Sequence, residues 1–123
     1  MTTWITVCDT CKRENWSERG MERTDGEAFA IRIEAAARGR NMKVRRHSCL
    51  MACRNACNVA IQADGKFAYV LGGFDNSEEN AAAIVDYARI YEESETGLVP
   101  RDQRPQAVKG HFVSRYPPLP EGQ

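Results

Sequence analysis

The sequence predicts an α/β protein with one sheet. Two stretches with helical spacing of apolar residues alternate with short β-prone runs, and 123 residues suffice for one hydrophobic core but not for two. The predicted order along the chain is strand, helix, strand, strand, strand, helix and tail, without an internal repeat. This order favours a single domain with a sheet of about four strands, two helices and an extended C-terminal tail.

The first predicted strand ends in a cysteine motif, and a helix follows it. Residues 2–7 are rich in β-branched and aromatic side chains, and the run breaks at a Cys-x-x-Cys motif over residues 8–11. Thr24 and Glu27 have the spacing of a capping box, and apolar residues recur at helical intervals up to Gly39. We therefore expect a helix of about four turns after this motif.

Three further strands are expected before the second helix. Residues 42–47 alternate between weakly apolar and basic side chains, which predicts a short strand that leads towards Cys49. Residues 58–63 and 66–71 are β-prone runs joined by the pair 64–65, Asp-Gly, which favours a tight two-residue turn. The sequence therefore predicts a hairpin directly after the second group of cysteines.

A second helix and an irregular tail complete the predicted fold. Asn76 and Glu79 have capping-box spacing, and an apolar stripe at helical intervals continues to about Glu93. Five prolines after residue 97 disfavour long helices and central strands. We therefore expect residues 97–123 to form a tail that packs on the domain or on a second copy of the chain through Phe112, Val113 and Tyr116.

Composition and charge exclude several functional classes. Basic and acidic residues balance at 17 each, so no net charge points to nucleic acid. No apolar run approaches the roughly 20 residues of a membrane span, and the first residues lack the pattern of an export signal. We therefore expect a cytoplasmic protein that binds neither nucleic acid nor membrane.

The five cysteines are the candidate functional residues. Their odd number and the expected reducing compartment argue against a disulfide framework. They form two short-spaced groups, and these groups converge if the strands that precede them are neighbours. Two thiolates for each iron is what a 2Fe-2S cluster needs. The sequence therefore favours a metal centre built from Cys8, Cys11, Cys49, Cys53 and Cys57.

Residues 49–57, Cys-Leu-Met-Ala-Cys-Arg-Asn-Ala-Cys, followed by the Asp-Gly hairpin, resemble a loop of known iron–sulfur proteins. That loop is the second cysteine loop of thioredoxin-like 2Fe-2S ferredoxins and of the related small subunit of respiratory NADH dehydrogenase. Over nearly the full chain, the sequence resembles an uncharacterised family of predicted metal-binding proteins, often encoded beside cobalamin-biosynthesis genes. The predicted order of elements is also that of thioredoxin-like domains, so we expect a thioredoxin-like ferredoxin domain over residues 1–96.

The ferredoxin resemblance implies a ligand set. It implies that Cys49 and Cys53 bind one iron and, by position, that Cys8 and Cys11 bind the other. The sequence departs from the ferredoxin pattern because the first pair is more closely spaced and because Cys57 stands where those proteins commonly have proline. Cys57 is then either a buried thiol that binds no metal or a replacement for Cys11 or Cys53 in the ligand set.

The same cysteines allow two other functions. Four thiolates also suit zinc or cobalt, in a structural or metal-delivery role that the gene neighbourhood would link to cobalamin metabolism. Cys8 and Cys11 could instead form a thiol-disulfide redox pair. No proline occurs before Pro100, however, and a thioredoxin site needs a cis-proline loop opposite its cysteines.

Charge is strongly segregated along the neutral chain. Residues 75–95 contain seven acidic side chains and one basic one, whereas residues 38–54 contain six basic side chains and no acidic one. Cations near an oxidised, dianionic cluster favour its reduced form and steer an acidic redox partner. The alternative is that the two segments pair with each other or are simply solvated. We therefore expect an electron carrier rather than an enzyme, with an acidic protein partner that meets some of Arg38, Arg40, Lys43, Arg45, Arg46 and Arg54.

Overall fold

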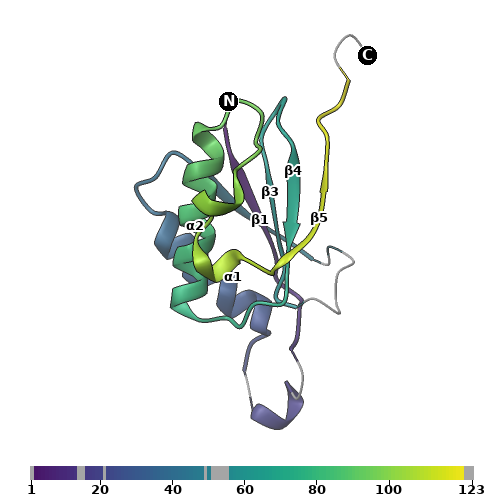
Figure 1. Cartoon of the computed structure of the whole chain (residues 1–123). Coiled ribbons are helices and arrows are strands. Elements are labelled where there is room, and N and C mark those ends of the chain that lie inside the picture. The colour runs from purple at the N-terminus through teal and green to yellow at the C-terminus, as the bar shows by residue number, and fades with distance from the viewer. Residues whose placement is uncertain (1, 14–15, 21, 49, 51–55, 121–123) are drawn as a thin grey trace.

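Five strands form one sheet in the order β2-β1-β3-β4-β5, and two helices cover one of its faces, as a computed structural model shows (Figure 1). The structure describes residues 2–13, 16–20, 22–48, 50 and 56–120. The chain is therefore α/β, as predicted. The strands are β1 (Trp4–Cys8), β2 (Lys43–His47), β3 (Val59–Gln62), β4 (Ala68–Leu71) and β5 (Phe112–Tyr116), and the helices are α1 (Asp25–Ala37) and α2 (Glu78–Glu93).

β1 and β2 are parallel neighbours, and α1 connects them. Val7 lies opposite Arg46 and Cys8 opposite His47, so both strands end at the same edge of the sheet. This arrangement confirms the predicted strand-helix-strand opening. It also brings the segment after β1 close to the segment after β2, because the carboxyl ends of parallel strands meet at one end of a sheet.

α1 begins where its capping signal predicts. The Thr24 hydroxyl accepts a hydrogen bond of 3.0 Å from the backbone N–H of Glu27. Phe29, Ala30 and Ile33 then face the sheet and are fully buried. The helix ends at Ala37, two residues before the predicted Gly39 stop, which has a positive φ of 81°.

The predicted hairpin is present, but its loop is longer than two residues. β3 and β4 are antiparallel, with Ile61 opposite Tyr69, and residues 63–67 connect them. Within the loop the Lys66 N–H donates to the Ala63 carbonyl at 3.2 Å. The loop also bonds to the end of α2 and to the segment after it: the Lys66 ammonium donates to the Glu92 carbonyl at 2.8 Å, and the Phe67 N–H donates to the Thr96 carbonyl at 2.8 Å. These bonds hold the hairpin against the helix.

α2 ends at Glu93 as predicted, but its cap is one residue later than the sequence indicates. The Ser77 hydroxyl, rather than the Asn76 side chain, caps the helix by accepting from the Asn80 N–H at 3.2 Å. Asn76 is used elsewhere, in a polar cluster with α1 that is described below. Among the described residues, no helix combines the length and the apolar character that crossing a membrane requires.

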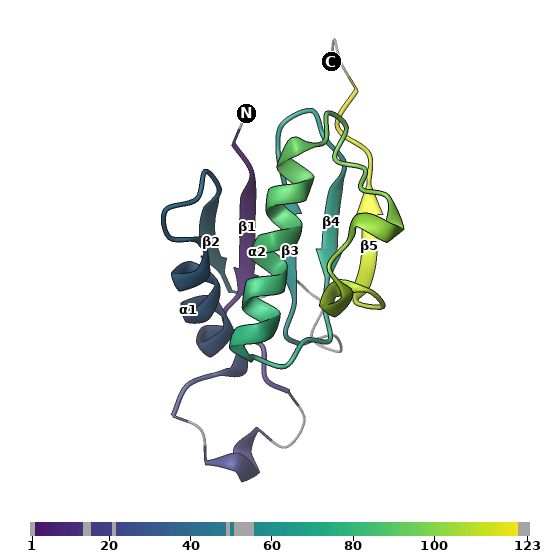
Figure 2. The ribbon, with the colours of Figure 1, turned by 60° about the vertical axis from the view of Figure 1, so that its left-hand side comes forward.

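The segment expected to be an irregular tail adds a fifth strand to the sheet. It first forms two short 3₁₀ helices, η3 (Arg101–Gln103) and η4 (Gln106–Val108), which lie beside β5 in Figure 2, and β5 then pairs antiparallel with β4. β5 lies at the edge of the sheet and contains no proline, so the prolines before and after it do not prevent it from pairing with β4. The Phe112 ring packs 5.4 Å from Tyr87, whereas Val113 and Tyr116 are 43% and 47% exposed.

Gly97 tests the contact between the segment after α2 and the hairpin loop. It has a φ of 83°, and an added Cβ would lie 2.9 Å from Cε2 of Tyr91 and 3.0 Å from backbone atoms of Phe67. Gly110 has the same φ, at 84°, but open space around it, so it isolates the cost of backbone conformation. We expect Gly97→Ala to lower the free energy of unfolding by about 3 kcal/mol and Gly110→Ala by about 1 kcal/mol, measured by urea denaturation. Equal losses would contradict this packing.

Candidate metal centre

Cys8 and Cys11 form a buried pair of thiols at the end of β1. Cys8 is the last residue of the strand, and the two side chains are only 1% and 3% exposed. The Cys11 thiol donates a hydrogen bond to the sulfur of Cys8 across 2.9 Å. The structure thus brings together the first predicted pair of ligands, side by side and shielded from water.

The start of α1 packs directly on the loop that carries this pair. The Gly26 N–H donates to the Cys11 carbonyl at 2.9 Å, and the Thr24 hydroxyl donates to the Asp9 carbonyl. A Cβ at position 26 would overlap the carbonyl oxygen of Cys8. Only glycine allows this approach, so residue 26 fixes the distance between the helix and the cysteine loop.

Cys49 and Cys53, of the second cysteine group, lie outside the described residues. Two described residues, Leu50 and Asn58, show how this part of the chain meets the first pair. The backbone amide of Leu50 hydrogen-bonds the sulfur of Cys8. The Asn58 amide donates to the sulfur of Cys11 at 3.0 Å. A residue within the second cysteine group, Leu50, and the residue directly after it, Asn58, therefore reach the first pair.

These contacts give the two thiols opposite acidities. Burial alone would raise the pKa of Cys8, but the hydrogen bonds from Cys11, from Thr10 and from the Leu50 amide outweigh it and lower that pKa below its ordinary value. Burial and the adjacent Cys8 raise the pKa of Cys11 well above the ordinary value, against the opposing effect of Asn58. Cys8 is therefore the more readily ionised thiol, and binding a metal to both would release the proton that Cys11 holds.

Cys57 has the surroundings of a small core residue. Its side chain is 0% exposed, and its N–H donates to the Phe74 carbonyl at 2.9 Å. Burial, assisted by the negative charge of Asp25, raises the pKa of Cys57 to about 12. This thiol packs in the hydrophobic core as a small apolar residue, which is in line with the hypothesis that Cys57 binds no metal.

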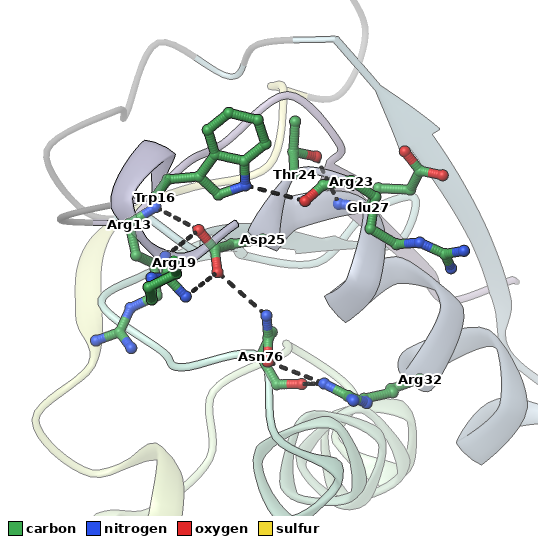
Figure 3. Close-up of polar contacts among 9 residues, drawn as sticks. All are labelled: Arg13, Trp16, Arg19, Arg23, Thr24, Asp25, Glu27, Arg32 and Asn76. Carbon is green, nitrogen blue, oxygen red and sulfur yellow. Dashed lines mark hydrogen bonds and ion pairs between the residues drawn. The ribbon is translucent and has the colours of Figure 1, made fainter. Parts of the chain in front are cut away.

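A buried carboxylate, Asp25, anchors the segment between Cys11 and α1 (Figure 3). Asp25 is 0% exposed and accepts from the Arg13 N–H at 2.7 Å, from the Arg19 guanidinium at 2.9 and 3.1 Å and from the Asn76 amide at 3.2 Å. Burial would raise the pKa of Asp25, but Arg19 and the Arg13 amide hold it below its ordinary value. The Arg32 guanidinium, in turn, donates to the Asn76 side chain at 2.9 Å.

Sequence reasoning missed this cluster. Its one signal in the sequence is the acidic Asp25 in the first turn of α1. An exposed acidic residue that stabilises the helix N-terminus would give the same pattern. Within the described part of the chain, no three histidine, cysteine or acidic side chains are placed together to hold a metal. The described thiols are soft donors of the kind that iron–sulfur clusters and zinc take, so they fit half of a four-thiolate set.

The fold and the thiol pair define the class of protein: an α/β protein with one mixed sheet and a buried dithiol at the end of its parallel strand pair. The chain belongs to a family described as a protein of unknown function (DUF1636), whose model matches residues 5–118. This membership confirms the resemblance to an uncharacterised family. No curated protein and no solved structure matches the chain.

Asp25 should contribute far more to the free energy of unfolding than the carboxylate of an exposed ion pair does. We expect Asp25→Ala to lower the free energy of unfolding by about 3 kcal/mol, because it removes several hydrogen bonds that involve a buried charge. Glu34→Ala is the matched control, since Glu34 pairs with Arg46 at 2.7 Å and both side chains are more than a third exposed. It should cost less than about 1 kcal/mol. Similar losses in denaturant unfolding would show that Asp25 anchors nothing.

Cys57 should make the metal-free, reduced protein less stable in alkali. The folded protein keeps the Cys57 proton up to a pKa of about 12, whereas an ordinary thiol loses it near 9.0. The unfolded chain therefore binds fewer protons between these values, and stability falls as pH rises. Between pH 8 and pH 10 we expect the wild type to lose about 1 kcal/mol more than Cys57→Ala. Parallel losses in the two proteins would mean that Cys57 titrates normally.

Proposed function

We propose that this chain binds a 2Fe-2S cluster through Cys8, Cys11, Cys49 and Cys53 and transfers electrons to a protein partner. The observation that carries the proposal is the convergence on one point of a buried thiol pair and the backbone of the second cysteine segment. Cys8 and Cys11 are 2.9 Å apart, and the Leu50 amide, next in sequence to Cys49, hydrogen-bonds Cys8. When bound, such a cluster supplies a one-electron redox couple.

The environment of the two sulfurs suits thiolate ligands. The N–H groups of Leu50 and Asn58 stabilise negative charge on Cys8 and Cys11, respectively. Hydrogen bonds to ligand sulfurs also raise the reduction potential of iron–sulfur centres. The near-complete burial of both cysteines would keep water from the metal. The chain therefore has the features of a protected electron-transfer site rather than of an open catalytic one.

The arrangement of the sheet supports a thioredoxin-like fold for the first four strands. The order β2-β1-β3-β4, with a parallel first pair, an antiparallel hairpin and both helices on one face, is the arrangement expected of that fold. In it, the loops after the first and second strands lie side by side. This is where the two cysteine groups occur in the sequence, as the ferredoxin resemblance requires.

The open face of the sheet supports an acidic partner. Lys43 and Arg45 project from β2 over the Trp4 ring, at 5.6 and 5.7 Å from its centre. Arg46 instead pairs with Glu34 of α1, so the basic strand does not neutralise the acidic helix α2 through this residue. Cations along β2, the strand that leads to the second cysteine group, would steer a partner that presents carboxylates.

Thiol-disulfide exchange is the second candidate, and one observation favours it. A lowered pKa on Cys8 beside a proton-holding Cys11 is the asymmetry that redox-active cysteine pairs use. Both sulfurs are almost fully buried, however, so an incoming disulfide has no access to Cys8. Zinc or cobalt would suit the same donors, and metal analysis separates both from iron.

Five single cysteine-to-serine variants test the proposal. Each is purified without air, and its iron, sulfide and visible absorption are measured. We expect serine at position 8, 11, 49 or 53 to abolish the cluster or leave it labile, because a hydroxyl is a harder and far less acidic ligand than a thiol. Cys57→Ser, the matched control, should keep its iron.

Two results would contradict this assignment in different ways. If Cys57→Ser loses its iron while Cys11→Ser keeps it, the ligands are Cys8, Cys49, Cys53 and Cys57. If the wild type contains zinc or cobalt with no sulfide, the cluster is wrong and the metal-delivery alternative replaces it.

A further inference from the structure

Asn58 lies directly before β3, beside the buried thiol pair. Val7 lies opposite Val59 in the antiparallel pairing of β1 and β3, so Asn58 follows as the residue opposite Cys8. The Cys8 N–H donates to the Asn58 carbonyl at 3.2 Å, which extends this pairing by one residue. The register of the sheet therefore fixes the position of Asn58 relative to the end of β1.

Asn58 provides two N–H donors to one sulfur. Its side-chain amide donates to the sulfur of Cys11 at 3.0 Å, and its backbone N–H donates to the same sulfur. Asn58 is 0% exposed and Cys11 is 3% exposed, so water does not compete for these bonds. Hydrogen bonds in such a place are electrostatically stronger than those made in water.

The side-chain amide differs from the other N–H donors at the thiols. The backbone N–H groups of Thr10 and Leu50 bond Cys8, and the backbone N–H of Asn58 bonds Cys11. These backbone donors need only the path of the chain, because every residue except proline has one. Among the described residues, the Asn58 amide is the one side-chain N–H group that donates to either thiol. Position 58 is therefore where the type of side chain decides how many N–H groups reach this pair.

A donor to a ligand sulfur favours the reduced form of an iron–sulfur cluster. Reduction adds one negative charge, which spreads in part onto the ligand sulfurs, and an N–H dipole directed at a sulfur stabilises that charge. The stabilisation is larger in a buried site, because water does not screen the dipole.

We infer that the side-chain amide of Asn58 raises the reduction potential of the metal centre by donating to the sulfur of Cys11. Asn58 acts through a ligand, so it is a positioning residue and not a ligand itself. The inference rests on the proposed function, because only a redox-active centre has a potential to raise. It extends that function by naming the side chain that sets how readily the centre is reduced.

Two substitutions at position 58 test the inference in the anaerobically purified, cluster-loaded protein. Asn58→Leu nearly keeps the size of the side chain, Asn58→Ala leaves room around it, and both remove the amide while they retain the backbone N–H. We expect each to lower the ratio of reduced to oxidised cluster about tenfold at a given potential, a shift of ~59 mV for one electron. The potential is measured by a dithionite titration monitored by electron paramagnetic resonance.

Asn80→Leu is the matched control. The Asn80 amide donates to the Asp75 carboxylate at 2.7 Å and to no sulfur, so this variant should keep the wild-type potential. An unchanged potential in both Asn58 variants, or an equal shift in Asn80→Leu, would overturn the inference.

Loss of iron would also be decisive. If both Asn58 variants lose their iron but stay folded by circular dichroism, the inference is wrong, because Asn58 would then hold the cluster instead of setting its potential. A wild-type protein without iron and sulfide would contradict the proposed function, and this inference with it.

Discussion

The close approach of α1 to the Cys8–Cys11 loop is the constraint on which the rest of the structure depends. Gly26 makes it sterically possible and donates to the Cys11 carbonyl at 2.9 Å. Once the start of α1 is fixed there, the buried face of this helix sets its position over β1 and β2. The parallel register of these strands then brings their ends, and the segments after them, to one edge of the sheet. The thiol pair is therefore positioned by regular elements and not by a free loop.

Polar groups also hold the thiol pair in place, through a buried carboxylate beside the cysteine loop and through N–H donors to the two sulfurs. Asp25 ties the segment that leaves Cys11 to Arg19 and to Asn76 just before α2, so both helices and the cysteine loop share one buried carboxylate. Leu50 and Asn58 bring N–H donors to the two sulfurs from the segments after β2 and before β3. Thiolates in a buried place need such donors, because burial alone disfavours the charged form of a thiol.

Much of the fold follows from local sequence signals, and the exceptions have physical causes. The cap at Thr24 and the alternating pattern of the strands depend on neighbouring residues, so they were predictable. β5 was not, because the prolines around it obscure an edge strand whose pairing with β4 is a long-range contact. Asp25 was missed because its partners are distant in sequence, and the α2 cap was misplaced by one residue because Asn76 serves that cluster instead of the helix. Metal binding by Cys8, Cys11, Cys49 and Cys53 stays a prediction.

The central claim is that the converging thiols hold an iron–sulfur cluster that changes oxidation state. Electron paramagnetic resonance of the anaerobically purified wild-type protein, before and after reduction with dithionite, tests it most directly. An oxidised 2Fe-2S cluster has paired spins and a reduced one has an unpaired electron, so the account predicts a signal that appears only on reduction, with iron and sulfide in equal amounts. A protein that stays silent on reduction and contains zinc would contradict it.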